Sequence, residues 1–430
     1  MSIVWCIFRD IHIERQHPND LRNRIVGARL QMDGLSPYFY HWKPADGVRY
    51  YDWNNGWPTL QISNITATPF FHQLLYPIAN LQQRTISVIW LVTEYLVLLV
   101  MTMLALRMAK QPIQKSAVAV TVLLFLHCYG WRTGIEQGQM YILIPLLAFL
   151  FYVIITSKPS LFHAALAGII SASLLLIRPN TALFFLPFVL LLPRYNVKYK
   201  MIFAASLIAV FVAAFGSIHS RFYWSDYRKA ISEHIKLQHG LDPLVTKNPP
   251  VPVLNQYEGW NWKQIEQARL FPFHDRTNEQ GNVFVLLNMS LHIQTPVWLL
   301  SLLFAIFIFV LSFLFWRFYK PIDQIDAYSF STLGFYLYMA SDLFSPVQRA
   351  NYNVSQWIFP LLLTACVYSS SIKKVWIVGI LAGLLLNSLS FYLFPMRHTV
   401  GEYVIFASLL GILFTTKLEV MTNLKPIIKA

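Results

Sequence analysis

The sequence predicts an all-α polytopic membrane protein: a bundle of about 11–12 transmembrane helices, the first of them truncated. Hydrophobic residues make up 56% of the chain and charged residues 13%, about half the charged fraction of a soluble globular protein. Eleven long apolar stretches run from Arg84 to the C-terminus, each near the ~20 residues that cross a bilayer. We therefore expect one transmembrane domain over residues 1–430.

The apolar stretches define the expected spans, whose ends are set by the first charged or turn-forming residues. They are 85–106, 116–130, 140–157, 161–177, 180–193, 201–219, 295–316, 327–343, 354–371, 374–394 and 400–416. The apolar segment 2–8, closed by Arg9 and Asp10, is too short to span a bilayer. We interpret it as the outer end of a first transmembrane helix whose start is missing; an interfacial anchor is the alternative.

Loop charge sets the orientation. Every second loop is short and rich in Lys or Arg, which is typical of loops that stay in the cytoplasm. The two long polar segments, 9–83 and 220–294, then both fall on the extracytoplasmic side. We expect a multi-pass protein of the cytoplasmic (inner) membrane with an extracytoplasmic active site. Many of the Lys and Arg residues behind the net charge of +14 lie in the short cytoplasmic loops. We therefore expect membrane lipids, and no nucleic acid, as partners.

The first long loop contains a candidate catalytic segment. Asn19 or Asp20 can cap a helix that begins just afterwards and ends at Gly34, with Ile25, Ala28 and Met32 on one face. A carboxylate at a membrane–water boundary is well placed to take a proton from a hydroxyl. From spacing alone, Asp20 is either such a base or only a helix cap, and the spacing favours the cap.

Aromatic residues follow in the same loop. Trp53 and Trp57, with Trp42, Tyr50 and Tyr51, alternate with charged residues, a pattern that suits either sugar stacking or an interfacial aromatic belt. Residues 67–80 are expected to form a short amphipathic helix along the membrane. Segment 220–294 is expected to contain short helices and irregular loop, and to act as a lid or binding surface rather than a solvated tether.

Short outer turns supply cations and amides. Arg178 and Arg349 break the charge rule for outer loops, and a guanidinium pairs well with phosphate; salt bridges to Glu136 or Asp342 are the alternative. Buried Glu94 is expected to be protonated and packed against a neighbouring helix. The three cysteines have no metal or disulfide spacing. No nucleotide-sugar Asp-x-Asp pair exists, and we expect no metal or cofactor.

Taken in order, several short motifs resemble integral-membrane glycosyltransferases of the GT-C fold, and most closely family 87, which includes mycobacterial polyprenyl-phosphate-mannose-dependent mannosyltransferases. The resemblance covers Asp20 to about residue 360. Its motifs are Asp20 with the helix up to Gly34-Leu35-Ser36-Pro37-Tyr38, Thr68-Pro69-Phe70-Phe71, Gly138-Gln139-Met140-Tyr141, Arg178-Pro179 and Ser345-Pro346. The chain departs from the family in Met140-Tyr141, in Arg178 where the family has Lys, and in lacking His after the Ser-Pro turn.

The resemblance implies an inverting, metal-independent transfer of mannose or a similar sugar from a polyprenyl-phosphate carrier. The acceptor would be a glycolipid, a polysaccharide or a protein at the outer face of the membrane. Asp20 would be the general base, and Arg178 and Arg349 would bind the donor phosphate. Substrate binding would involve Gln139, Glu136, Trp53, Trp57 and Tyr352. The alternative function is a membrane transporter or lipid flippase, which usually shows internal repeats and ionisable groups at depth.

Overall fold

The computed structural model describes most of the chain, and within that part every regular element is a helix. The residues described are 2–14, 19–40, 44–51, 66–216, 220–238, 281–291, 295–319, 326–347, 349–368, 372–389, 393–394 and 396–415. They divide into two compact units, and the division falls inside three of the helices. Unit 1 comprises 1–96, 132–140 and 211–278, and unit 2 comprises 97–131, 141–210 and 279–430. That the chain forms a single domain stays a prediction.

Unit 1 is built around a short polar helix that is buried on every side. This helix, α2, has no apolar stripe, and residues 21–31 are all buried, including three arginines. It packs against α3, and α11 packs against α3 as well. The elements of this unit are α1 (Ser2–Glu14), α2 (Asn19–Met32), η1 (Pro44–Asp46), α3 (Pro69–Ala79), α11 (Ser220–Gln238), the first half of α4 (Gln83–Met108) and most of α6 (Tyr129–Gln137).

The arginines of α2 are tolerated inside unit 1 because backbone carbonyls accept their hydrogen bonds. Arg22 donates to the carbonyl oxygens of Tyr51 and Val48, and Arg29 donates to that of Ala79 at 2.6 Å. A buried guanidinium without acceptors would cost several kcal/mol. These contacts fix α2 in its place, so its position is set by polar bonds as much as by apolar packing.

Unit 2 surrounds one fully buried helix, α15 (Ala327–Leu343), in which nearly every residue is buried. Helices α7, α9, α14, α16 and α18 pack around it. The other elements of this unit are α5 (Pro112–His127), α7 (Leu143–Thr156), α8 (Leu161–Ile177), η2 (Pro179–Thr181), α9 (Ala182–Phe185), η3 (Pro187–Arg194), α10 (Val197–Phe215), α13 (Val283–Leu291), α14 (Val297–Phe318), η5 (Asn351–Trp357), α16 (Ile358–Cys366), α17 (Lys374–Ser388) and α18 (Arg397–Thr415).

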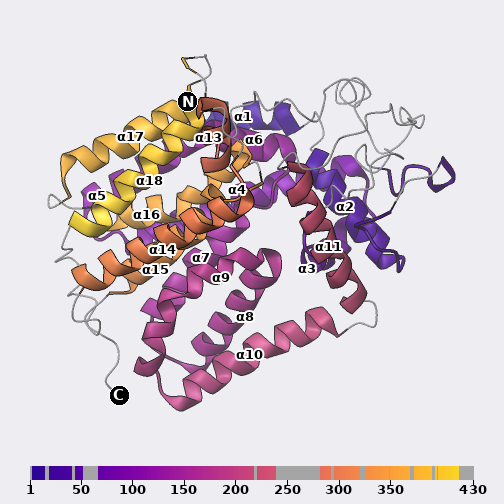
Figure 1. Ribbon diagram of the computed structural model, residues 1–430, viewed down its shortest axis with the longest axis horizontal. Coiled ribbons are helices and arrows are strands. Elements are labelled where there is room, and N and C mark those ends of the chain that lie inside the picture. The colour runs from indigo at the N-terminus through magenta and orange to yellow at the C-terminus, as the bar shows by residue number, and fades with distance from the viewer. Residues whose placement is uncertain are drawn as a thin grey trace. The chain divides into compact units, whose positions relative to one another are not determined.

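The helices α17 and α18 lie side by side along most of their length (Figure 1). Small residues permit this close approach: a Cβ added to Gly383 would lie 2.5 Å from the carbonyl oxygen of Gly401. Association through glycines is typical of membrane helices, which gain no hydrophobic driving force from one another in lipid.

The expected all-α membrane architecture is confirmed. Four described helices are long and apolar enough to cross a bilayer, namely α4, α10, α14 and α18, and the bent pair α5–α6 adds a fifth. Helices α7, α8 and α17 are shorter apolar helices. The predicted bounds 161–177 and 327–343 coincide with α8 and α15.

Three expected spans were wrong in detail. The stretch 180–193 forms η2, α9 and η3 instead of one helix, because Pro179, Pro187 and Pro193 lack the backbone N–H that a continuous helix needs. The stretch 116–130 begins at Pro112 and breaks at Cys128, where α6 turns by 57°. The stretch 354–371 divides into η5 and α16.

At the N-terminus, α1 continues past Arg9 and Asp10 to Glu14, so these two residues do not end the helix. The Asp10 carboxylate is buried and accepts hydrogen bonds from Tyr95 and Arg9, which lets a charged residue lie inside the helix. Glu94 is buried, as expected, and accepts a hydrogen bond from Trp90 Nε1 at 2.9 Å.

Candidate functional site

Asp20 lies in the first turn of α2, as the sequence predicts. Its side chain is half-buried, and its Oδ2 accepts a hydrogen bond from the side-chain amide of Gln139. The other end of that amide, Oε1, accepts a hydrogen bond from Arg24 Nη2 at 2.6 Å. Because Arg24 can only donate, it fixes the orientation of the Gln139 amide, and the amide N–H must then face Asp20.

The Gly138-Gln139 motif has a structural reason. Gly138 has φ +61°, a left-handed conformation that glycine adopts without strain. Its N–H donates to the carbonyl of Ile135, and the N–H of Gln139 donates to that of Gly134 at 3.0 Å. This pair of bonds is the Schellman motif that ends helix α6. The motif places Gln139 directly after the helix end, where its buried side chain reaches Asp20 and Arg24.

Burial raises the pKa of the Asp20 carboxyl, and the Arg24 guanidinium and the Gln139 hydrogen bond partly oppose that rise. A carboxylate with a raised pKa is a stronger base than a solvated one. Arg24 also donates to the Gly138 carbonyl at 3.3 Å, so one cation supports both Asp20 and the turn that carries its partner. The arrangement can accept a proton from a bound hydroxyl.

The buried helix α2 is closed on one side by His72 of α3. A Cβ on Gly27 would lie 2.6 Å from His72 Nε2, so only glycine fits here. Burial, with a smaller effect of Arg24, lowers the pKa of His72 to about 3. His72 is therefore neutral at physiological pH and adds no charge near the Asp20 arrangement.

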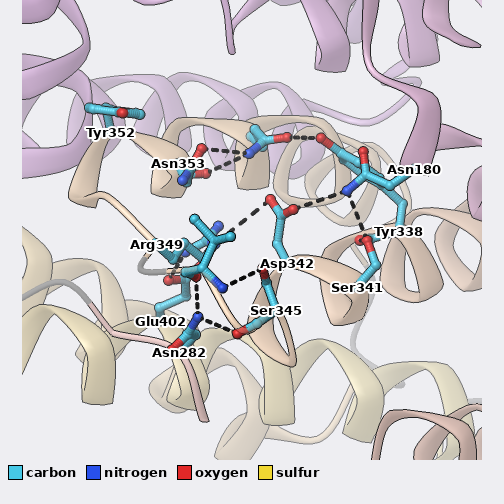
Figure 2. Close-up of polar contacts among 12 residues, drawn as sticks. Asn180, Asn282, Tyr338, Ser341, Asp342, Ser345, Arg349, Tyr352, Asn353 and Glu402 are labelled. Atoms are coloured by element: carbon cyan, nitrogen blue, oxygen red, sulfur yellow. Dashed lines mark hydrogen bonds and ion pairs between the residues drawn. The ribbon is translucent and has the colours of Figure 1, made fainter. Parts of the chain in front are cut away.

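In unit 2, the predicted phosphate-binding residues Arg178 and Arg349 lie in one polar cluster. Figure 2 shows Arg349 and Asp342 of this cluster. Both guanidinium groups face Asp342 at the end of α15: Arg178 Nη2 lies 2.6 Å from Oδ1 and Arg349 Nε lies 3.8 Å from Oδ2. Asn180 donates to the same carboxylate at 3.1 Å. The salt bridge to Asp342, one of the two alternatives left open by the sequence, is present.

The two arginines differ in their surroundings. The side chain of Arg178 is 18% exposed and its Cζ lies 4.6 Å from the centre of the Tyr141 ring. The Tyr352 ring stacks on the Tyr141 ring, and the two ring centres lie 5.4 Å apart. Arg349 is buried and pairs with Glu402 of α18. Arg349 is therefore held from two sides by carboxylates, whereas Arg178 is partly exposed and packs against the Tyr141 ring.

The loop that carries Arg349 is anchored by Asn282 (Figure 2). Asn282 is fully buried, and its amide donates to the carbonyl oxygens of Ser345 and Val347 at 2.8 and 2.6 Å. Its Oδ1 accepts from the Val285 N–H and so caps the start of α13. The Ser345-Pro346 turn and the start of α13 thereby form one rigid corner beside Arg349.

The structure brings the predicted site residues together in two groups. Asp20 and Gln139 lie in unit 1, and Arg178, Arg349 and Tyr352 lie in unit 2. Glu136 is half-buried on α6. Trp53 and Trp57 lie outside the described residues. Of the three residues expected on one face of α2, Ile25 and Ala28 are buried, whereas Met32, the last residue of the helix, is 40% exposed.

Sequence reasoning missed three supporting residues. Arg24 follows Asp20 by four positions, a spacing that places the two on one helix face. Glu402 is an acid inside an apolar stretch, which is itself a functional signal. No sequence pattern indicates the role of Asn282, because its side-chain amide donates hydrogen bonds to residues more than sixty positions away. Within the described residues, no three His, Cys, Asp or Glu side chains are grouped to hold a metal ion.

One segment of the chain matches a known family. The model of glycosyltransferase family 87 matches residues 66–242. The matched segment covers less than half of the 430 residues of the chain. The match confirms the resemblance inferred from the motifs. It includes Thr68-Pro69, Gly138-Gln139 and Arg178-Pro179, and it leaves Asp20 and the Ser345-Pro346 turn outside.

Other comparisons add less. Among solved structures, the chain is similar to ArnT from Cupriavidus metallidurans bound to undecaprenyl phosphate, with 12% identity and a TM-score of 0.40 over 99% of this chain and 79% of that one. At that TM-score the superposition carries no argument about this chain. The search of curated proteins found no match.

Proposed function

We propose that this glycosyltransferase moves mannose or a similar sugar from a polyprenyl-phosphate carrier to an acceptor hydroxyl. The transfer would occur at the outer face of the cytoplasmic membrane, in one inverting step. The observation that carries the proposal is the Asp20 arrangement. A half-buried carboxylate with a raised pKa accepts a bond from Gln139, whose position is fixed by a turn within the family 87 segment.

In this step Asp20 takes the proton of the acceptor hydroxyl, whose oxygen forms a bond to the anomeric carbon. The bond from that carbon to the carrier phosphate breaks, and its electron pair leaves with the lipid phosphate. Gln139 keeps Asp20 oriented through its amide N–H. The proposed acceptors are a glycolipid, a polysaccharide or a protein, with Glu136, Trp53 and Trp57 near the acceptor or the sugar.

We assign the donor phosphate to Arg178 and Arg349. Each guanidinium can stabilise charge as it develops on the leaving phosphate. Arg178 is the more accessible of the two and lies over Tyr141. Arg349 has its Nη2 buried, with no hydrogen-bond acceptor among the described residues. Since a buried N–H seeks an acceptor, a phosphate oxygen would satisfy it. Tyr352, stacked on Tyr141, would contact the sugar or the carrier.

The test is a transfer assay on the full-length protein in detergent, with radiolabelled polyprenyl-phosphate-mannose as donor and a membrane lipid extract as acceptor. We expect labelled product, release of polyprenyl phosphate and an inverted anomeric configuration by NMR. Arg178→Gln should raise the KM for the donor roughly 10- to 100-fold, the size of one lost charged hydrogen bond. The matched control is Arg317→Gln, an exposed arginine at the end of α14.

Two results would overturn the proposal. Retention of the anomeric configuration would exclude a single displacement. Movement of the labelled donor across reconstituted vesicles with no glycosidic bond formed would instead favour the transporter or flippase alternative.

A further inference from the structure

A cavity of about 510 Å³ lies within unit 2 between α7, α8, the η3 segment and α10. Aliphatic and aromatic side chains line most of its wall. Its polar wall residues are Ser171, Tyr195, Tyr199 and Lys200. None of them takes part in the Arg178 cluster, so the cavity is separate from the proposed donor site. The function described above assigns nothing to this cavity.

Lys200 is the charged residue of this wall. It lies in the first turn of α10, which begins after Asn196, whose side chain accepts a hydrogen bond from the Tyr199 N–H. Its side chain is half-buried, and within the described residues no carboxylate lies at ion-pair distance from it. The Tyr195 and Tyr199 rings stack 4.5 Å apart nearby. A half-buried ammonium beside an apolar cavity suits a ligand with an anionic head and an apolar tail.

The cavity has the size of one acyl chain. An apolar cavity of about 150 Å³ binds one benzene molecule, which has six carbons, so a cavity of about 510 Å³ accommodates roughly twenty carbons. The tail of a long polyprenyl carrier is several times larger. Val189 and Leu192 line the cavity and are 57% and 43% exposed. The cavity therefore opens at the surface of the unit, where a lipid can enter it.

We propose that this cavity binds one acyl chain of an anionic phospholipid whose phosphate pairs with Lys200. Lys200 belongs to the loop set that charge assigns to the cytoplasmic side. The membrane leaflet on that side attracts basic residues through its anionic lipids. The proposal does not rest on the glycosyl transfer proposed above.

The test uses the purified full-length protein, titrated in detergent with dioleoylphosphatidylglycerol or dioleoylphosphatidylcholine, with the melting temperature as readout. The anionic lipid should raise the melting temperature, and the zwitterionic lipid should raise it less. Lys200→Glu should weaken the apparent affinity about 25-fold, since each unit of charge at an anionic lipid surface changes binding about fivefold. Lys198→Glu, an exposed lysine on the same turn outside the cavity wall, should not.

A second pair of variants tests the cavity itself. Ala204 lines the cavity and its neighbour Ala205 does not, although both are exposed. Ala204→Trp should abolish the stabilisation by phosphatidylglycerol, and Ala205→Trp should leave it intact. The melting temperature without lipid shows whether each variant is folded. Equal effects of the two lysine variants, or equal stabilisation by both lipids, would overturn the proposal. So would a polyprenyl phosphate that binds through Lys200 and Ala204 when phosphatidylglycerol does not.

Discussion

Replacing Asp20 with asparagine should separate catalysis from folding. Asparagine keeps the shape of the side chain and an oxygen that can still accept the Gln139 hydrogen bond. It removes the negative charge and the ability to take a proton. If Asp20 is the base, kcat should fall 10²- to 10⁴-fold, about 3 to 5 kcal/mol of transition-state stabilisation.

Folding should respond differently. The pKa of Asp20 is raised in the folded protein by burial, so the unfolded chain holds the ionised form more readily. The folded protein therefore loses stability as the pH rises from the unfolded pKa of Asp20 through its folded pKa, because the buried site holds the ionised carboxylate less well than water does. The neutral asparagine avoids that loss. At neutral pH the melting temperature of Asp20→Asn should therefore equal or exceed that of the wild type.

The assay is the labelled mannose transfer described above, run beside a thermal unfolding curve of the same preparation. A helix-cap role makes another prediction, because asparagine caps a helix as well as aspartate does. Full activity in Asp20→Asn would therefore refute the assignment of the base and leave Asp20 as a cap. A loss of activity together with a lower melting temperature would refute the energetic reasoning.

Three further perturbations follow from the same geometry. Arg24→Gln removes the charge that lowers the pKa of Asp20, so the acid limb of kcat/KM should move to higher pH; an unmoved limb in the pH profile would count against Asp20. Gly138→Ala must place a side chain at φ +61°, which should cost about 1–2 kcal/mol and lower both the melting temperature and kcat. Glu402→Gln leaves the buried guanidinium of Arg349 with one carboxylate and should destabilise by about 3 kcal/mol, measurable by chemical unfolding; an unchanged unfolding midpoint would remove this pair from the account.

The unequal surroundings of the two cations make their roles distinguishable. Arg349 lies between Asp342 and Glu402, and Trp357 Nε1 also donates to Glu402. Its loss should damage folding first. Arg178 is partly exposed over an aromatic ring, so its loss should damage donor binding first. The sequence placed both arginines in outer turns and gave no reason to treat them differently.

Local sequence patterns predicted helices well where backbone geometry or capping alone sets the helix end. The helix of the first loop and the amphipathic helix now seen as α3 were both predicted, since Gly34 and Thr68 mark helix ends through backbone geometry and capping. All three cysteines are buried and free, as their scattered spacing indicated. The predicted helix bounds were wrong where prolines divided an apolar stretch. The burial of the α2 arginines was not predicted, because the carbonyl groups that accept their hydrogen bonds lie far from α2 in the sequence.

The amino-acid sequence by itself predicted a helical membrane protein with two long polar segments and the motifs of a glycosyltransferase. It could do so because hydrophobic length, loop charge and short backbone motifs are local properties. Only the tertiary structure decided which groups meet. Gln139 reaches Asp20 across more than a hundred residues, Arg178 and Arg349 share Asp342, and Asn282 holds the turn before Arg349. Such contacts depend on how distant helices pack, and no local pattern records them.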